Sequence, residues 1–195
     1  MVSITRALRN ASLLLLAALA FALGAGAAHA GSIEAVRGQL NPGDEGYVLA
    51  ARFDIDLGSA LEEAVTKGVT LTFTLEFGIE RKRWYWFDER IVGRVIDYRL
   101  SYNALTQQYR LSVGGLHTNH ATLAEALSVL GHVEGLVVAS NSAIVLGNTY
   151  TAELRLALDK SQLPKPFQLD ALANKNWQVD ARTLTWQFAP GVVGR

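Results

Sequence analysis

Three groups of side chains in this sequence could do chemistry, and the densest is a run of cations and aromatic rings. Residues 81–86 read RKRWYW, three cations and three aromatics in six positions. Cations and exposed ring faces together can bind an anionic glycan, a lipid headgroup or a partner protein through cation–π contacts. Arg81, Arg83, Trp84 and Trp86 are therefore candidate binding residues. We favour the alternative, in which the arginines pair with nearby acids and a tryptophan closes the core, because large rings are usually mostly buried.

Two carboxylate pairs form the second group. Asp88 directly precedes Glu89, and one residue separates Asp54 from Asp56. General acid/base catalysis needs two carboxyl groups in different environments at a defined separation, and neighbours on a strand edge do not provide that. A hydrolase of envelope polymers using Asp88 or Glu89 stays a third hypothesis, because it would need a further carboxylate across a cleft.

The third group is a pair of histidines. His117 and His120 have three-residue spacing, and Glu125 follows them, so a metal site can be imagined. A catalytic zinc normally takes three protein ligands and a water, and GGLHTNH has the composition of an exposed loop. The chain contains no cysteine. We therefore expect no catalytic residues, no metal and no cofactor, and a protein that is not an enzyme.

The elements that must position these groups are mostly strands. Alternation of apolar and polar residues is typical of strands with one buried face. It predicts strands over 47–57, 71–79 and 150–158, a hairpin over 95–113 that turns at 103–106, and weaker strands over 33–40, 136–140 and 176–188. Short helices are expected over 59–68, opened by Ser59 and Glu62 at capping-box spacing, and over 122–131, opened by Thr122. The fold class is mainly β, an antiparallel sandwich-like domain with two short helices; a curled α+β sheet is the alternative.

Three places break the alternation. A straight strand through RKRWYW would bury arginines or expose tryptophans, which predicts a bend, bulge or break between Gly78 and Trp84. The last strand changes phase near Arg182 and Thr183, which predicts a bulge there. Residues 163–167, LPKPF, are predicted to be a rigid extended crossing to that strand, because each proline disfavours helix in its predecessor.

The first thirty residues have the pattern of an export leader. Arg6 and Arg9 precede an apolar run over 11–23, and Ala28 and Ala30 occupy the small-residue positions of a cleavage site. An uncleaved anchor is the alternative, but the run is short against the roughly 20 residues that span a bilayer. We predict a signal peptide over 1–30, one β-rich domain over 31–195, no transmembrane segment in the mature chain, and a periplasmic location.

Charge bears on the class of partner. The whole chain has 18 basic and 18 acidic residues, and removal of the leader with Arg6 and Arg9 leaves 16 against 18, a net charge of −2. Nucleic-acid binding needs a clustered excess of positive charge. We therefore expect no nucleic-acid partner.

Several segments together resemble a proteobacterial family of exported proteins, a domain of unknown function sometimes titled proline-rich signal peptide protein. YNALTQQY at 102–109 and LPKPFQ at 163–168 are the most specific parts, and the similarity extends through RFDIDL, RWYWFDE, TLAEALSVL and NWQVDARTLTWQF. The family provides no catalytic residues to carry over. Its genes often lie beside those for a membrane sensor histidine kinase and its regulator, so the resemblance implies a link to envelope signalling.

These observations lead to two hypotheses of function. The first is a non-enzymatic periplasmic module that binds another envelope protein, with a membrane sensor kinase as one candidate partner. The second is a periplasmic carrier or binder of an apolar or glycan ligand. A ligand-sized cavity would favour the carrier, and a filled core with an exposed patch would favour the interaction module.

Overall fold

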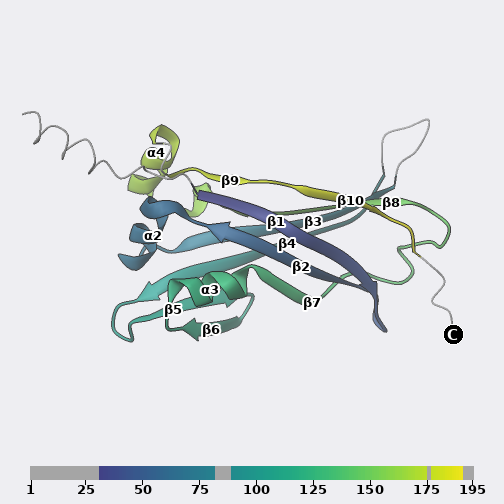
Figure 1. Ribbon diagram of the computed structural model, residues 1–195, viewed down its shortest axis with the longest axis horizontal. Coiled ribbons are helices and arrows are strands. Elements are labelled where there is room, and N and C mark those ends of the chain that lie inside the picture. The colour runs from purple at the N-terminus through teal and green to yellow at the C-terminus, as the bar shows by residue number, and fades with distance from the viewer. Residues whose placement is uncertain (1–30, 82–88, 175–176, 191–195) are drawn as a thin grey trace, which may run out of the picture.

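The alternating segments build two stacked β-sheets (Figure 1). The computed structural model describes residues 31–81, 89–174 and 177–190. The smaller sheet has the order β7 (His132–Ala139), β2 (Tyr47–Asp56), β1 (Gly31–Pro42), β9 (Val179–Ala181). The larger sheet has the order β10 (Leu184–Phe188), β8 (Tyr150–Leu158), β3 (Leu71–Arg81), β4 (Glu89–Asn103), β5 (Gln108–Val113), β6 (Leu116–His120). All pairs are antiparallel except β1 with β9. The mainly β, sandwich-like fold expected from the sequence is confirmed.

The core lies between the sheets and is filled by the apolar face of each strand. The odd-numbered residues of β3 are at most 1% exposed from Leu71 to Ile79, and the even-numbered residues of β8 are equally enclosed from Ala152 to Leu156. These two strands pair with each other in the middle of the larger sheet, so their apolar faces form one continuous surface. Among the described residues, no buried side-chain nitrogen or oxygen lacks a hydrogen-bond partner. The interior is therefore well packed, and its buried polar side-chain atoms are hydrogen-bonded, as a stable native core requires.

Three α-helices connect strands of different sheets: α2 (Gly58–Thr66), α3 (Leu123–Leu130) and α4 (Lys165–Ala173). The two helices expected from the sequence correspond to α2 and α3. Gly68 follows α2 with a φ of 92°, the left-handed conformation that glycine adopts readily after a helix. The capping box expected at Ser59 is wrong: the N-cap is Leu57, which has no side-chain cap, and the Asp56 carboxylate accepts the N–H of Gly58 at 2.8 Å.

The extended crossing expected at LPKPF is also wrong beyond its first residues. Leu163 is extended, with φ −66° and ψ 148°, but α4 begins at Lys165 after a short 3-10 turn, η1 (Lys160–Gln162). Pro164 and Pro166 sit at the start of the helix, where backbone N–H groups have no partner within the helix in any case. The carbonyl of Pro164 accepts the N–H of Phe167 at 2.9 Å. Prolines at these positions therefore open the helix and do not prevent it.

The phase change near Arg182 marks a change of sheet. β9 pairs with β1 in the smaller sheet and β10 pairs with β8 in the larger one, so the chain crosses the sandwich between them. The backbone N–H of Arg182 donates to the carbonyl of Ile33 at 3.1 Å. The sequence located the irregularity correctly, but its cause is this crossing and not a bulge within one strand.

The crossing of β9 and β10 closes one long side of the sandwich, which we call the closed side. The ring of Trp186 contacts β1 at Gly38 and lies 6.3 Å from the ring of Phe77, between centroids. Phe188 stacks on Tyr150 at 5.5 Å between centroids and lies 6.4 Å from Tyr47. Aromatic rings from both sheets therefore fill this side.

The opposite long side, which we call the open side, has no such crossing strand. Here β7 is the last strand of the smaller sheet, while β4, β5 and β6 end the larger one. α3 links β6 to β7 and lies between the two sheet edges (Figure 1). It is anchored by Ala126 and Leu130, which are at most 1% exposed. The open side is thus covered by a single short helix, and a groove lies on each side of it.

Candidate functional site

The RKRWYW segment begins at the end of β3, and only its first residue, Arg81, is among the described residues. Arg81 is the last residue of β3 and is paired with Glu89, the first residue of β4, through an ion pair at 2.5 Å. The other predicted binding residues, Arg83, Trp84 and Trp86, lie outside the described residues. The pairing of Arg81 with a nearby acid, which the favoured interpretation expected, is therefore present.

The irregularity expected in this hairpin is present. The register of β3 against β4 shifts between Ile79 and Glu80, where β4 has one additional residue, Ile91. Such a bulge bends the pair and changes which side chains face the core. Part of the predicted interval, residues 82–84, lies outside the described part of the chain.

Two of the predicted carboxylates have separate partners in the described structure. Glu89 is the ion-pair partner of Arg81, Asp56 caps the start of α2, and Asp88 is outside the described residues. His117 and His120 belong to strand β6, so the expected loop is wrong, and Nε2 of His120 lies 2.8 Å from the Thr118 hydroxyl. Within the described residues, no three histidine, aspartate or glutamate side chains are placed to hold a metal ion.

The first groove of the open side is apolar, and we call it the apolar groove. It has a volume of about 410 Å³ and separates β7 from the inner face of β4, β5 and β6. Most of its walls are aliphatic, with one tyrosine: Ile96, Tyr98, Leu111, Val113, Leu116, Val129, Val133 and Leu136. Leu116 is 77% exposed and Val129 is 43% exposed, which is unusual for side chains so close to a core. The groove is therefore an accessible apolar surface next to the edge of a sheet.

The irregular edge of β7 shapes this groove. The register of β7 against β2 shifts twice, and Gly135 at the first shift has a φ of 72°. Bulges of this kind twist an edge strand away from regular pairing. At the far end of β7, the Arg94 side chain of β4 donates to the carbonyl of Val138 at 3.3 Å and links the two sheets. The groove thus lies where the sheets separate and ends near this bond.

Tyr98 brings a polar group into the apolar groove. It lies on the groove-facing side of β4, opposite Val113 of β5. Burial raises the pKa of the Tyr98 hydroxyl above its ordinary value of 10.0, because an ionised phenolate would lose hydration there. The hydroxyl is therefore kept neutral, and it can donate or accept a hydrogen bond in a groove whose lining is mostly apolar but also includes His117, Thr118, His132 and Glu134.

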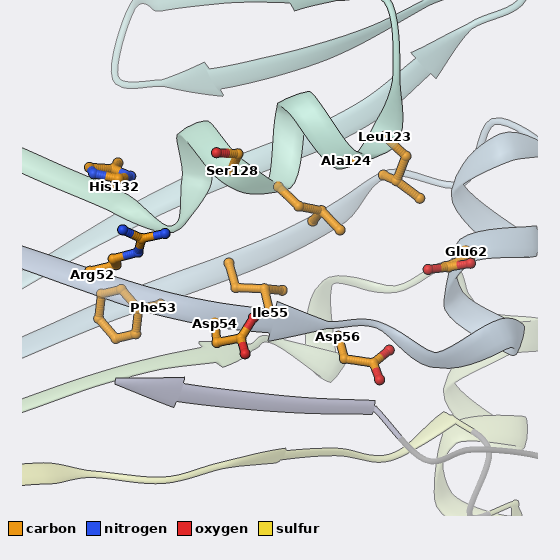
Figure 2. Close-up of a pocket in the computed structure, with 11 residues that line it drawn as sticks. Arg52, Phe53, Asp54, Ile55, Asp56, Glu62, Leu123, Ala124, Ser128 and His132 are labelled. Atoms are coloured by element: carbon orange, nitrogen blue, oxygen red, sulfur yellow. The ribbon is translucent and has the colours of Figure 1, made fainter. Parts of the chain in front are cut away.

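The second groove lies on the other side of α3, and we call it the acidic groove (Figure 2). It has a volume of about 560 Å³ and runs between β2, α3 and the first turns of α2. Ile55 points toward α3, whereas Asp54 and Asp56 project from the side of β2 away from the helix, and Glu62 approaches from α2. Arg52 and His132 close the other end. Three carboxylates and one guanidinium therefore line this groove, together with Leu123 and Leu127 of α3.

α3 is held between the grooves by local sequence features. The Thr122 hydroxyl accepts the N–H of Glu125 at 3.2 Å, and the Glu125 carboxylate accepts the N–H of Ala121 at 3.1 Å. The Thr122 cap expected from the sequence is therefore present, but Glu125 bonds the N–H of the residue before the N-cap and not that of Thr122 itself, as a capping box would. Gly131 then allows close approach to β2, because an added Cβ would lie only 2.6 Å from the carbonyl oxygen of Phe53.

Sequence reasoning did not find either groove. The walls come from β2, from the hairpins of the larger sheet, and from α3 with β7, and only strand pairing brings these segments together. One local signal was available: Leu116 stands among glycine and polar residues, without an apolar partner two residues away on either side. The described part of the chain has no helix long and apolar enough to cross a membrane.

Comparison with known proteins gives a family but no close relative. No curated protein and no solved structure matches the chain. One family model, described as a domain of unknown function, matches residues 30–187, which include both sheets, all three helices and both grooves. The chain therefore belongs to the family of the domain of unknown function DUF4390.

Proposed function

We propose that this protein is a non-enzymatic, periplasmic protein-interaction module that holds an apolar segment of another envelope protein in the apolar groove. One observation carries the proposal: the core is filled, yet Leu116 and Val129 stay exposed beside a sheet edge. Exposed apolar surface next to an irregular edge costs solubility, and proteins keep such patches chiefly where a partner covers them. The aliphatic lining suits binding and offers little for group transfer.

The proposal also includes a location, the periplasm, and a class of partner, a membrane sensor kinase. The leader pattern over residues 1–30 supports export, with cleavage after Ala30 leaving Gly31 as the first residue. Gly31 is buried at the start of β1, paired with Val179. The resemblance in sequence supports a membrane sensor kinase as the candidate partner, through the part of the kinase outside the inner membrane.

Site-specific photocrosslinking in intact cells tests the proposal. A photo-reactive phenylalanine analogue replaces Leu116 in the groove or, as the matched control, Leu105 at the β4–β5 turn, which is 93% exposed. We expect a discrete crosslinked product with one envelope protein from position 116 and none from position 105. Val129→Lys should abolish that product, because a charge in the groove wall opposes apolar burial.

The outcome that contradicts the proposal is equally specific. If position 116 yields no product, or the same products as position 105, while the protein is abundant and exported, the groove does not hold a partner segment. If cell fractionation finds the protein in the cytoplasm with its leader intact, the proposed address is wrong.

A carrier of an apolar small molecule is the second candidate, favoured by the size of the groove. Its volume of about 410 Å³ lies within the range of about 300 to 1,000 Å³ typical of small-molecule sites. Native mass spectrometry of the protein purified from cells distinguishes the two candidates. A bound small molecule that is lost in Val129→Lys supports the carrier, whereas an unliganded mass together with crosslinking at position 116 supports the interaction module.

A further inference from the structure

The edge of β2 is exposed along the acidic groove because β7 is shorter than β2. Within the described residues, β2 pairs with β7 only as far as Arg52, which lies opposite His132. Beyond that point Phe53–Asp56 pair with β1 on one side and face the acidic groove on the other. All four of these residues line the groove. A strand edge with a sheet on only one side is a template for a further strand.

α3 occupies only the first position of this edge. The N–H of Phe53 donates to the carbonyl of Gly131 at 2.8 Å. Backbone groups on one side of a strand come from every second residue, so Ile55 is the next residue whose N–H and C=O face this side. An extended segment bonded to Ile55 would continue the line of β7 in the smaller sheet.

The side chains of β2 determine which segment fits there. Ile55 points toward α3, while Asp54 and Asp56 project from the opposite face (Figure 2). In a neighbouring strand, side chains alternate in the same way and meet those of β2 across the pair. One face of the incoming strand therefore meets Ile55 and Leu127, and the other meets carboxylates.

Charge around the groove gives the sign of that second face. Asp54, Asp56 and Glu62 are exposed carboxylates at the groove, and Arg52 is its single guanidinium. Glu34 lies directly opposite Asp54 on β1 and extends the acidic surface, although Arg182 pairs with it at 3.0 Å. Opposite charges on facing strands stabilise pairing and like charges oppose it. An acidic strand would be repelled here and a basic one attracted.

We infer that the acidic groove binds an extended protein segment in which lysine or arginine alternates with apolar residues, added as a strand to the edge of β2 at Phe53–Asp56. The basic side chains pair with Asp54, Asp56 and Glu62, and the apolar ones cover Ile55 and Leu127. This site is separate from the apolar groove and does not depend on the function proposed for it.

Synthetic peptides test the inference on the purified protein. Fluorescence anisotropy compares a labelled six-residue peptide of alternating lysine and valine with one of alternating glutamate and valine, and with a peptide of three lysines followed by three valines. We expect binding of the alternating basic peptide, weakening as salt is raised, and at least tenfold weaker binding of the other two. Equal binding of the clustered basic peptide would overturn strand addition, and equal binding of the acidic peptide would overturn the charge argument.

Variants locate the binding site. Asp54→Asn combined with Glu62→Gln should raise the Kd of the alternating basic peptide about threefold to tenfold, since each exposed charge contact is modest. Glu63→Gln is the matched control: it is exposed on the same helix but pairs with Lys67 and does not line the groove. An unchanged Kd in the double variant, or an equal loss in the control, would overturn the inference.

NMR places the bound peptide independently of charge. The amide signals of Phe53–Asp56 and of α3 should shift when the alternating basic peptide is added, and Val129→Lys in the apolar groove should leave these shifts unchanged. Shifts confined to other strands would overturn the inference. If crosslinking from position 116 fails but the peptide still binds, that result contradicts only the function proposed for the apolar groove.

Discussion

The two long sides of this sandwich differ in how the chain covers the core between the edges of the two sheets. On the closed side the chain crosses from one sheet to the other between β9 and β10 (Figure 1). Aromatic rings from both sheets meet behind this crossing. On the open side the sheets end at different strands, and one helix of eight residues spans the gap. An extended crossing therefore closes one side, while the chain connection on the other side runs through a short helix that leaves a groove on each of its flanks.

We expect the closed side to contribute mainly to the stability of the domain, whereas the proposed binding surfaces lie on the open side. The closed side combines buried rings with a glycine that admits one of them, which makes it intolerant of changes in volume. The open side leaves aliphatic and charged side chains accessible at two sheet edges, which is where partners can add contacts. Variants on the closed side should change the free energy of unfolding, and variants on the open side should change binding.

The largest effect is expected from truncating the core ring behind the closed side. Phe77 is 1% exposed, and its ring lies 6.3 Å from that of Trp186 between centroids. Phe77→Ala should lower the free energy of unfolding by about 3 to 5 kcal/mol, because it removes a buried ring and leaves a cavity. Denaturant unfolding measures this. Leu116→Ala in the apolar groove is the comparison and should change stability by less than about 0.5 kcal/mol; similar losses in both would remove the distinction between the two sides.

The next effect concerns the contact between β1 and β10. An ideal Cβ at Gly38 would lie 2.8 Å from atoms Cη2 and Cζ3 of Trp186, a distance that real Cβ contacts essentially never show. Gly38→Ala should therefore cost about 1 to 3 kcal/mol through overpacking. Adding Trp186→Leu should recover part of that loss, because the smaller side chain removes the clash. Simple additivity of the two changes in a double-mutant cycle would contradict this account of the closed side.

Local patterns were enough to predict the strands but not the sides of the sandwich. The period of two in β2, β3 and β8 identifies buried faces, because each residue's environment follows from its neighbours in sequence. The phase change at Arg182 was visible in the same way. Its cause, a change of sheet, depends on pairing with β1 and β8, which lie more than twenty residues away along the chain.

The grooves were unpredictable for the same reason. Leu116 follows two glycines and precedes HTNH, a composition typical of a loop, and only its pairing with Val113 makes it a wall of the apolar groove. The edge of β2 is exposed because β7 begins at His132, a register that no local pattern specifies. Of the binding residues chosen from composition, the structure describes Arg81, which lines neither groove; Arg83, Trp84 and Trp86 lie outside the described residues.

A smaller effect is expected at the cap of the helix that covers the open side. The Thr122 hydroxyl accepts the N–H of Glu125, so Thr122→Ala should lower the free energy of unfolding by about 1 kcal/mol. Ser59→Ala is the matched control, because Ser59 stands in the first turn of α2 but does not cap it. Hydrogen exchange should show faster opening of α3 and the start of β7, with the closed side unchanged. Uniformly faster exchange would mean that α3 is not an independent cover.

The smallest effect is a dependence of stability on alkaline pH, expected from the half-buried hydroxyl of Tyr98 on the open side. Burial raises the pKa of Tyr98 above its ordinary value of 10.0, so the folded protein holds this proton more tightly than the unfolded chain does. This contribution to stability is complete below about pH 10 and is lost as the pH rises through the folded pKa. Tyr98→Phe has no proton to lose. Thermal unfolding between pH 8 and 11 should therefore show the wild type losing more stability than Tyr98→Phe above pH 10. A partner segment in the apolar groove would bury Tyr98 further and widen that difference, whereas parallel curves for the two proteins would mean that water reaches the hydroxyl freely.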